Sequence, residues 1–228
     1  MICYLEEIYI KNFFPKTINE KGIFITFEGG EGSGKSTQIK YLSNLLSDQK
    51  IEHIITREPG GTDVGEQIRK VLVQGNIKKL DSFSEFLCFA ASRREHLKKI
   101  IFPALEDNKI VISDRFLDSS IVYQGMVGGL NLETILQVHN NFCYNKFPDL
   151  TLILDVDPEL GLKRKNINTL IENRFESFEN NFHTLVQEKF LELSKIYSKR
   201  CRLINANNDK DFIFNEIVEH IKHYFTSH

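Results

Sequence analysis

One glycine-rich stretch constrains the fold more than any other part of the chain. Residues Gly29–Ser36 have the pattern G-x-x-x-x-G-K-S and follow the apolar run Gly22–Phe27. A buried strand that leads into such a loop and then into a helix is the context of a phosphate-binding P-loop. Backbone N–H groups can surround a polyphosphate only where side chains are missing, and Gly29, Gly32 and Gly34 are also free to adopt positive φ. The sequence therefore predicts a nucleoside triphosphate site.

The loop residues have separate tasks in holding a triphosphate. Lys35 reaches the outer phosphates, and the Ser36 hydroxyl is a candidate Mg²⁺ ligand. The following helix begins with its positive end toward the anion. We expect the triphosphate to contact the whole loop: Gly29, Gly30, Glu31, Gly32, Ser33, Gly34, Lys35, Ser36 and Thr37.

Beyond the loop, apolar strands alternate with amphipathic helices, which predicts a parallel sheet with crossover helices. The expected fold class is α/β, a doubly wound five-stranded parallel sheet with helices on both faces. The expected strands are Gly22–Phe27, His53–Arg57, Lys109–Ser113, Leu150–Asp155 and Arg202–Asn205. The expected helices are Lys35–Asp48, Thr62–Val73, Ser82–Leu105, Ser119–Val127, Leu132–Asn141, Pro158–Lys165, Phe178–Ser198 and Asp211–Phe225.

Composition argues against several classes of protein. The 228 residues favour one domain, and the formal charge of −2 does not mark a nucleic-acid binder. No apolar run has the length of a membrane span, and the N-terminus lacks a signal-peptide pattern. We expect residues 1–20 to be a poorly ordered extension. Reduced thiols in the cytoplasm are expected, because no C-x-x-C pair occurs among Cys3, Cys88, Cys143 and Cys201.

In a parallel sheet, ligands bind at the carboxyl ends of the strands. The second expected strand is followed by E-P-G-G-T, where Pro59 holds Glu58 extended and two glycines turn the chain. We expect Arg57 and Glu58 to project into the same cleft as the P-loop. A solvated charge pair at a turn is the alternative. Arg69 lies on the next helix and is either part of the site or an ordinary surface residue.

The third expected helix presents a possible base site. Phe89 and Arg93 are four residues apart, which places an aromatic wall beside a guanidinium group. That pair suits stacking of a base and donation to its carbonyl or to a phosphate. We expect Arg94 to be solvated and His96 to be a hydrogen-bonded structural histidine.

Other features of this helix are structural. Ser82 and Glu85 predict a capping box, and Pro103 predicts the last turn. Apolar residues at helical spacing predict a buried stripe, which comprises Phe83, Phe86, Leu87, Ala90, Leu97, Ile101 and Ala104.

The strand that ends at Ser113 is followed by Asp114, in the form of a Walker B segment whose acid holds Mg²⁺. Ser36 and Asp114 are therefore the candidate metal ligands. On the helix just beyond, Ser120, Tyr123 and Gln124 are spaced i, i+3, i+4 and line one face. They offer a hydroxyl, a phenol and an amide to a single ligand.

A basic segment with polar middle residues lies at about 163–177. Lys163, Arg164, Lys165 and Arg174 flank a run rich in asparagine. This pattern predicts a closing lid that covers the transferring phosphates and excludes water. A charged surface helix end is the alternative.

These stretches together resemble the bacterial thymidylate kinases, of the nucleoside monophosphate kinase group. The resemblance runs from about Gly22 to the C-terminal helix. It implies a single domain at 21–228 that transfers a phosphoryl group from ATP to dTMP, with Mg²⁺, as a homodimer. It is carried by F-E-G-G-E-G-S-G-K-S-T, T-R-E-P-G-G-T, F-A-A-S-R-R-E-H-L, S-D-R-F-L-D-S-S-I-V-Y-Q-G and F-P-D-L-T-L-I-L-D-V.

The resemblance also implies residue roles on the acceptor side. The base-binding residues are Phe89, which would stack on thymine, and the polar readers Arg93, Ser120 and Gln124. Tyr123 corresponds to a tyrosine that crowds the sugar 2′ position. The contacts to the acceptor phosphate are Arg57, Arg69 and Arg115, with Glu58 orienting groups near the metal.

On the donor side, the resemblance places Ala206 and Arg164 beside adenine. One departure concerns the arginine that relatives place in the P-loop or the lid, because Gly32 and lid asparagines stand at those positions. We hypothesise that Arg164 or Arg174 reaches the transferred phosphoryl group instead.

Three other interpretations stay open. The chain could phosphorylate another nucleoside monophosphate or a deoxynucleoside. A P-loop switch protein would carry N-K-x-D for guanine, whereas the nearest string, at residues 145–148, is N-K-F-P. A catalytically silent binding protein is disfavoured by the joint presence of Lys35, Ser36 and Asp114.

Overall fold

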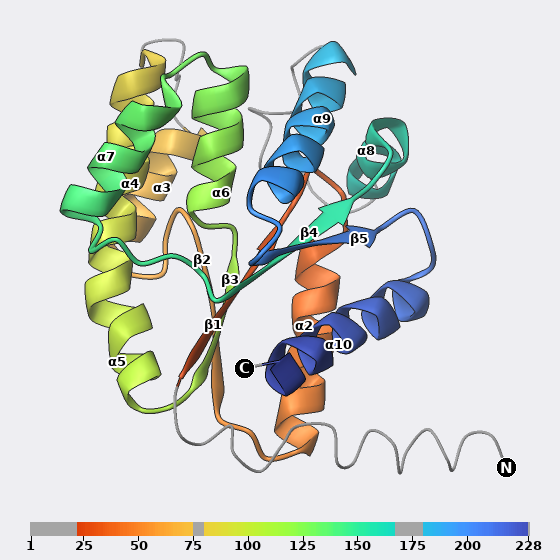
Figure 1. Cartoon of the computed structure of the whole chain (residues 1–228). Helices are drawn as coiled ribbons and strands as arrows, with labels where there is room; N and C mark the ends of the chain where they lie inside the picture. Colours follow the sequence, from red (N-terminus) through yellow and green to blue (C-terminus); the bar gives the residue numbers. More distant parts are fainter. Residues whose placement is uncertain (1–21, 75–79, 167–179, 228) are drawn as a thin grey trace, which may run out of the picture.

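The computed structural model describes residues 22–74, 80–166 and 180–227. Five parallel strands form one sheet in the order β2-β3-β1-β4-β5 (Figure 1). This confirms the doubly wound α/β prediction, with strand ends within one residue of those expected. The strands are β1 (Ile23–Glu28), β2 (His53–Arg57), β3 (Ile110–Asp114), β4 (Leu150–Asp155) and β5 (Cys201–Asn205).

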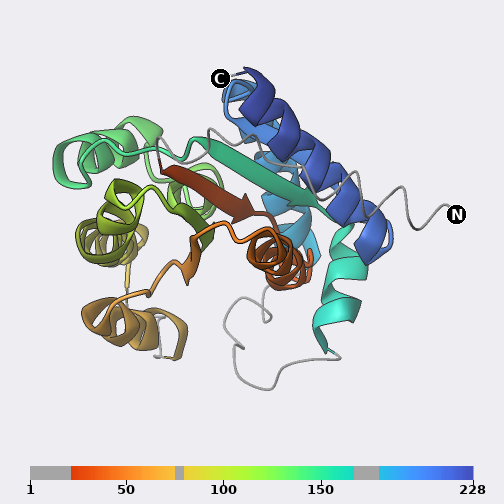
Figure 2. The same ribbon diagram turned by 90° about the horizontal axis from the view of Figure 1, so that it is seen from below.

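Helices cover both faces of the sheet (Figure 2). One face packs against α2 and α10. The other packs against α4, α7 and α9, together with the short elements η3, α5, α6 and η4. The helical elements are α2 (Lys35–Asp48), α3 (Asp63–Gln74), α4 (Ser82–His96), η3 (Leu97–Ile101), α5 (Phe102–Glu106), α6 (Leu117–Ser120), η4 (Ile121–Val127), α7 (Leu132–Phe142), α8 (Pro158–Asn166), α9 (Asn180–Ile196) and α10 (Lys210–Ser227).

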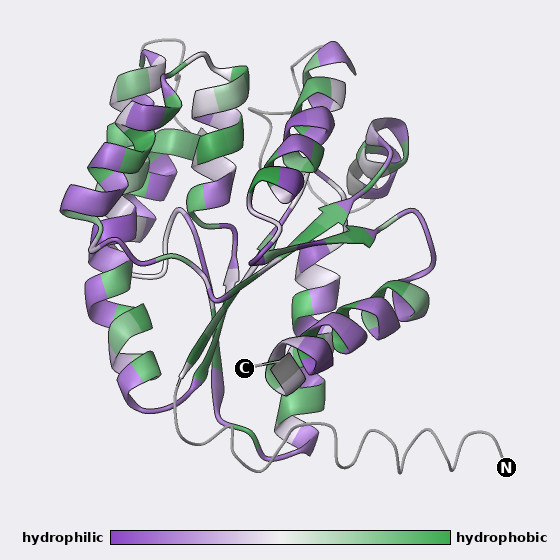
Figure 3. Ribbon diagram, in the orientation of Figure 1, coloured by the Kyte–Doolittle hydropathy of each residue, from purple (hydrophilic) through white to green (hydrophobic). Residues whose placement is uncertain are grey.

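The central strand β1 is buried along its whole length. Its apolar side chains alternate between two cores, with Phe27 facing α2 and Phe24 facing α4 and α9. Figure 3 shows the central strands coloured as hydrophobic between more polar outer helices. A strand that is covered on both faces needs apolar residues at nearly every position. Full burial of a side chain such as Phe27 contributes about 2 kcal/mol to stability.

The strand register sets the position of the site. Phe27 of β1 and Arg57 of β2 both pair with Asp114 of β3. The three strands therefore end at one level, so the loops that follow them leave the sheet side by side. This level is where the P-loop, the E-P-G-G turn and the D-R turn meet.

The expected helices Ser82–Leu105 and Ser119–Val127 each contain a π-helical segment. The first consists of α4, η3 and α5, and the second of α6 and η4. Pro103 lies in α5, which forms the last turn of this continuous helical run, as expected. Because proline has no N–H and its ring crowds the preceding turn, a wider turn before it relieves the clash.

Two details predicted for α4 are wrong. The N-cap is Asp81, whose carboxylate accepts from the backbone N–H groups of Phe83 and Ser84, so Ser82 and Glu85 form no capping box. Phe83 and Leu87 are exposed, although the other five members of the predicted stripe are buried. Helical spacing alone did not separate these two residues from the core-facing ones, because both faces of this helix carry apolar residues.

Some predictions fall outside the described residues. These are the poorly ordered extension at 1–20, Cys3 and most of the lid at 163–177. The other three cysteines are free thiols, as expected. Within the described ranges, no helix is long and apolar enough to cross a membrane.

The buried His139 makes folding stability sensitive to acid. Its Nε2 donates to Lys146 O at 2.9 Å, whereas Nδ1 has no partner among the described residues. Burial, with a smaller contribution from Arg93, lowers its pKa from 6.5 to about 4. The hydrogen bond to Lys146, and then the charges of Glu58 and Asp118, oppose that shift only partly. The unfolded chain therefore takes up a proton near pH 6.5 that the folded chain does not bind until about pH 4.

As the pH falls from 6.5 to 4, we expect the protonation of His139 to lower the free energy of unfolding by up to about 3 kcal/mol. His139→Gln keeps an N–H donor and removes the titration, so its stability should fall less steeply over that window. Urea unfolding at several pH values measures both slopes. Equal slopes in the two proteins would contradict the assignment.

Candidate active site

The P-loop has the conformation that its glycines predict. Gly29, Gly32 and Gly34 have φ values of 130°, 65° and 92°. Lys35 curls back over the loop, where its Nζ donates to Gly29 O at 3.2 Å, Gly30 O at 2.9 Å and Ser33 Oγ at 3.3 Å. Burial, together with the charge of Arg115, lowers the Lys35 pKa to about 8. A phosphate at this loop would restore the favourable environment of the ammonium group.

The two candidate metal ligands lie together. Ser36 Oγ, at the start of α2, donates to Asp114 Oδ2, at the end of β3, over 3.3 Å. A hydroxyl and a carboxylate are hard oxygen donors of the kind that Mg²⁺ prefers. Among the described residues no cluster of three or more His, Cys, Asp or Glu side chains occurs. The pair thus fits Mg²⁺ that completes its shell with water and phosphate oxygens.

An open cavity lies beside the P-loop, with about 670 Å³ of empty space when the adjoining solvent is counted. The lining includes most residues that the sequence analysis assigned to the acceptor: Glu58, Arg69, Phe89, Arg93, Arg115, Ser120, Tyr123 and Gln124. The other lining residues are Glu31, Pro59, Leu72, Val73, Phe116 and Ser119.

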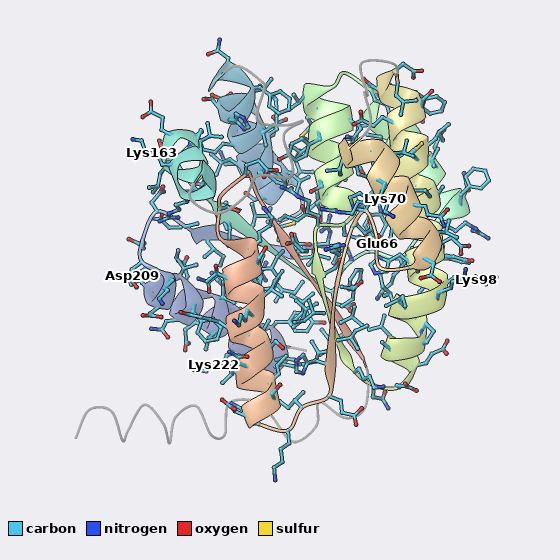
Figure 4. All side chains as sticks on the ribbon, turned by 180° about the vertical axis from the view of Figure 1, so that it is seen from behind. Glu66, Lys70, Lys98, Lys163, Asp209 and Lys222 are labelled. Carbon is cyan, nitrogen blue, oxygen red and sulfur yellow. The ribbon has the colours of Figure 1, made fainter. Side chains whose placement is uncertain are left out.

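Arg57 is not part of this lining. Its side chain is 52% exposed and pairs with Glu66 of α3, which Figure 4 labels, through Nη2 and Oε2 at 2.9 Å. Arg57 is therefore solvated, as in the alternative interpretation, but its partner is Glu66, whereas Glu58 is buried and lines the cavity. A contact between Arg57 and an acceptor phosphate stays a prediction.

Glu58 anchors Arg93, a role that the sequence analysis did not predict. The Glu58–Pro59 peptide is cis, and the Glu58 side chain is almost fully buried. Its Oε2 accepts from Arg93 Nε at 2.8 Å and its Oε1 from His96 Nδ1 at 3.0 Å. His96 also contacts Thr56 Oγ1 at 2.6 Å, which confirms it as a hydrogen-bonded histidine. No sequence spacing links residues 35 positions apart, so only the folded chain shows this pair.

The Arg93 guanidinium is held on three sides. Nη2 donates to Ser120 Oγ at 2.9 Å and to Phe116 O at 3.3 Å, while Nε is bound to Glu58. Nη1 is buried and has no partner within the described part of the chain. An unpaired buried donor costs free energy, so this nitrogen is available to a ligand oxygen. Arg94, by contrast, is exposed as predicted; it donates to Phe142 O and stacks on Tyr144.

Arg115 connects the P-loop to the cavity. Its Nη1 donates to Gly29 O at 3.1 Å and Ser119 Oγ at 3.0 Å, and its Nη2 donates to Glu31 Oε1 at 3.1 Å. Its backbone has φ of 69°, a strained value for a residue with a side chain. Glu31, assigned above to the triphosphate loop, thus turns its carboxylate toward the acceptor cavity.

Glu28 supports this strained turn and was not predicted. Its Oε1 accepts from the Phe116 N–H at 2.8 Å and its Oε2 from Ser119 Oγ at 2.6 Å. Burial, and then the nearby charge of Asp118, raise the Glu28 pKa to about 8. A glutamate at the end of a mostly apolar strand was the available clue in the sequence.

On the donor side, Arg164 of α8 lies against the loop after β5. It donates to Ala206 O at 2.7 Å and Asn208 O at 3.3 Å, and Ala206 is fully buried. The two residues that were expected beside adenine are therefore neighbours. Arg69 donates to Pro59 O at 3.1 Å on the acceptor side. Arg174 lies outside the described residues.

Comparisons with known proteins establish the family of this chain. The sequence model of the family described as thymidylate kinase matches residues 27–217. The chain belongs to the thymidylate kinase family. It is 42% identical over 203 residues to the thymidylate kinase of Clostridium novyi (strain NT), a match that covers 89% of this chain and 99% of that protein.

Further members of the family are similar over comparable lengths. The thymidylate kinase of Onion yellows phytoplasma is 42% identical over 205 residues, with coverage of 89% and 98%. The crystal structure of thymidylate kinase from Ehrlichia chaffeensis has a TM-score of 0.71 and 35% identity, and the match covers 88% of this chain and 98% of that one. This likeness supports the assigned family and fold together.

The tip of the P-loop is in backbone contact with α8, which explains its glycine. A Cβ atom on Gly32 would lie 1.8 Å from Gly161 O. A side chain at this position, basic or otherwise, therefore requires that α8 move. In the present arrangement of α8, an arginine at this position would clash with the helix.

We expect Gly32→Ala to destabilise the fold by more than about 2 kcal/mol, because clash adds to backbone strain. Gly129→Ala is the matched control, since Gly129 has φ of 78° and a Cβ atom added to it would meet nothing within 4 Å. It should cost about 1 kcal/mol, from strain alone. Urea unfolding measures both; equal losses would contradict a contact with α8.

Proposed function

We propose that this chain phosphorylates dTMP to dTDP with ATP and Mg²⁺, in deoxythymidine nucleotide synthesis. The observation that carries the proposal is the cavity beside the P-loop, which Phe89, Arg93 and Gln124 line together. Membership of the thymidylate kinase family supports the same reaction. The free thiols of Cys88, Cys143 and Cys201 favour a cytoplasmic enzyme. The formal net charge of −2 favours small-molecule substrates over nucleic acid.

In the proposed mechanism an oxygen of the acceptor phosphate attacks the γ-phosphorus of ATP, the bond from that phosphorus to the bridging oxygen breaks, and ADP leaves. No covalent enzyme intermediate is needed. Two anions that repel each other must be held in line, so positive charge and orientation are the main contributions of the protein. Lys35 supplies charge on the donor side, and Arg69 and Arg115 on the acceptor side. Ser36 and Asp114 would hold Mg²⁺, which neutralises phosphate charge when it is bound.

On the acceptor side, Phe89 would stack on the thymine base while Arg93, Ser120 and Gln124 contact its polar edge. Tyr123 stands beside Arg115, whose guanidinium carbon is 5.4 Å from the phenol ring centre. We propose that this phenol crowds the 2′ position and favours deoxyribose.

The direct test is a coupled kinase assay. Purified protein with ATP and Mg²⁺ should convert dTMP to dTDP faster than it phosphorylates dCMP, dGMP or AMP, and a chelator should abolish turnover. Phe89→Ala should raise KM for dTMP about tenfold, the usual loss on removing a stacking ring, and leave KM for ATP unchanged. Absence of dTMP turnover by the unaltered protein would contradict the proposed function.

We also propose that the segment at about 163–177 is a lid and that Arg174 contributes charge to the transferred phosphoryl group. The engagement of Arg164 with Ala206 and Asn208 supports Arg174 over Arg164 for this task. In the same assay, Arg174→Ala should lower kcat at least about tenfold with little change in either KM. A larger kcat loss in Arg164→Ala would reverse the assignment.

We further propose a homodimer that forms through α3 and α4. These helices pack on one another and expose apolar residues that a monomer would leave in water: Val64, Val71, Phe83 and Leu87. Exposed apolar patches of this kind are typical of protein interfaces.

Light scattering should therefore give twice the chain mass of 26.5 kDa. Leu87→Glu should yield a monomer, because a buried unpaired charge opposes association. Phe142→Glu, at a 60% exposed apolar residue of α7, is the control and should stay dimeric. A monomeric unaltered protein would refute the proposal.

A further inference from the structure

The amide of Gln124 is held in one orientation by a buried carboxylate. Glu85 of α4 is 8% exposed, and its Oε1 accepts from Gln124 Nε2 at 2.8 Å. An ionised carboxylate has no hydrogen to donate, so only the NH₂ end of the amide can face it. The orientation of Gln124 thus follows from chemistry, independently of how its nitrogen and oxygen are distinguished.

This orientation assigns a hydrogen-bond polarity to the cavity. Gln124 lines the cavity, and its Oε1 makes no hydrogen bond within the described part of the chain. The Arg93 Nη1 donor is likewise without a partner among those residues. The site therefore offers an acceptor from Gln124 and a donor from Arg93.

The complementary ligand edge carries an N–H beside a carbonyl oxygen. Thymine and uracil present this edge, with an imide N–H next to a carbonyl. Cytosine presents the reverse, a ring nitrogen acceptor next to an amino group. A cytosine in this cavity would leave two buried polar groups facing like partners, and such mismatches are rejected more strongly than a change in size.

We propose that Glu85 is a specificity-determining positioning residue: by fixing the amide of Gln124, it makes the base site accept imide pyrimidines and reject cytosine. This inference rests on the proposed dTMP kinase function and names the basis of its base selectivity. Glu85 itself does not contact the base. The pair of Glu85 and Gln124 does not discriminate thymine from uracil, because both bases present the same imide N–H and carbonyl oxygen.

The test compares three acceptors with ATP as donor: dTMP, dUMP and dCMP. In Glu85→Gln the residue at 85 can donate as well as accept, so Gln124 can turn either end toward the base. The ratio of kcat/KM for dTMP over dCMP should fall at least about tenfold, the factor expected for one buried mismatch. The ratio for dTMP over dUMP should stay within about twofold, and so should KM for ATP.

The chain offers a matched control. Glu133 accepts from Gln137 Nε2 at 3.1 Å on the exposed side of α7, so it forms the same type of pair away from the cavity. Glu133→Gln should leave all three kcat/KM values unchanged. This variant separates the effect of the pair in the cavity from that of any lost carboxylate.

A second variant tests polarity directly and also covers the case in which Glu85→Gln folds poorly. In the exchange Glu85→Gln with Gln124→Glu, the amide at 85 donates to the carboxylate at 124, whose second oxygen again accepts from the base. Selectivity for dTMP over dCMP should return to within about threefold of the unaltered protein. Failure of the folded exchange variant to recover it would overturn the inference.

The remaining outcomes are also decisive. An equal decrease of kcat/KM for all three acceptors in Glu85→Gln would show that Glu85 has only a structural role, and would overturn the inference. An unchanged dTMP to dCMP ratio would do the same. If the unaltered protein does not prefer dTMP to dCMP, the proposed function fails first, and the inference with it.

Discussion

The parallel register of β1 with β3 and β2 is the constraint on which the site depends. Because Phe27 and Arg57 are both level with Asp114, three loops leave the sheet at one edge. One loop carries the phosphate-binding glycines, one the Glu58 carboxylate and one the strained Arg115. Backbone hydrogen bonds of the sheet thus place groups from distant parts of the chain within contact distance, without any direct interaction between their sequences.

The buried and partly buried arginines of the site are paired with carboxylates and backbone carbonyls. Arg93 is matched by Glu58, and Arg115 by Glu31 and by the carbonyl of Gly29. A buried guanidinium without a partner would cost several kcal/mol, so these anions of the protein hold the arginines in place before any ligand binds. Groups held in this way need little rearrangement when a nucleotide enters, which is how a preorganised site contributes to catalysis. Glu28 and Glu85 act one step further away, since each holds a residue that faces the cavity.

The donor and acceptor halves of the site meet at the tip of the P-loop, where the loop backbone and α8 are closely packed. Gly32 touches the backbone of Gly161, and α8 in turn carries Arg164 to the loop at Ala206. The backbone contact joins the triphosphate loop to the helix that leads toward the proposed lid. The packing of α8 leaves no room for a side chain at position 32. We therefore proposed that the charge of a basic residue at this position is supplied by the lid.

The sequence by itself determined the fold class, the P-loop and the residue types that surround the acceptor. Glycine spacing and apolar periodicity are local properties, and the ends of parallel strands follow from them. It did not determine which partners the charged side chains choose: Glu58 bonds Arg93, Glu85 bonds Gln124 rather than capping its helix, and Arg57 turns to Glu66 at the surface. The sequence also did not predict that Phe83 and Leu87 are exposed, because apolar residues on two faces of a helix do not show which face packs against the core. Only the tertiary structure decided these points, because hydrogen-bond geometry and burial depend on distances between residues that sequence spacing does not encode.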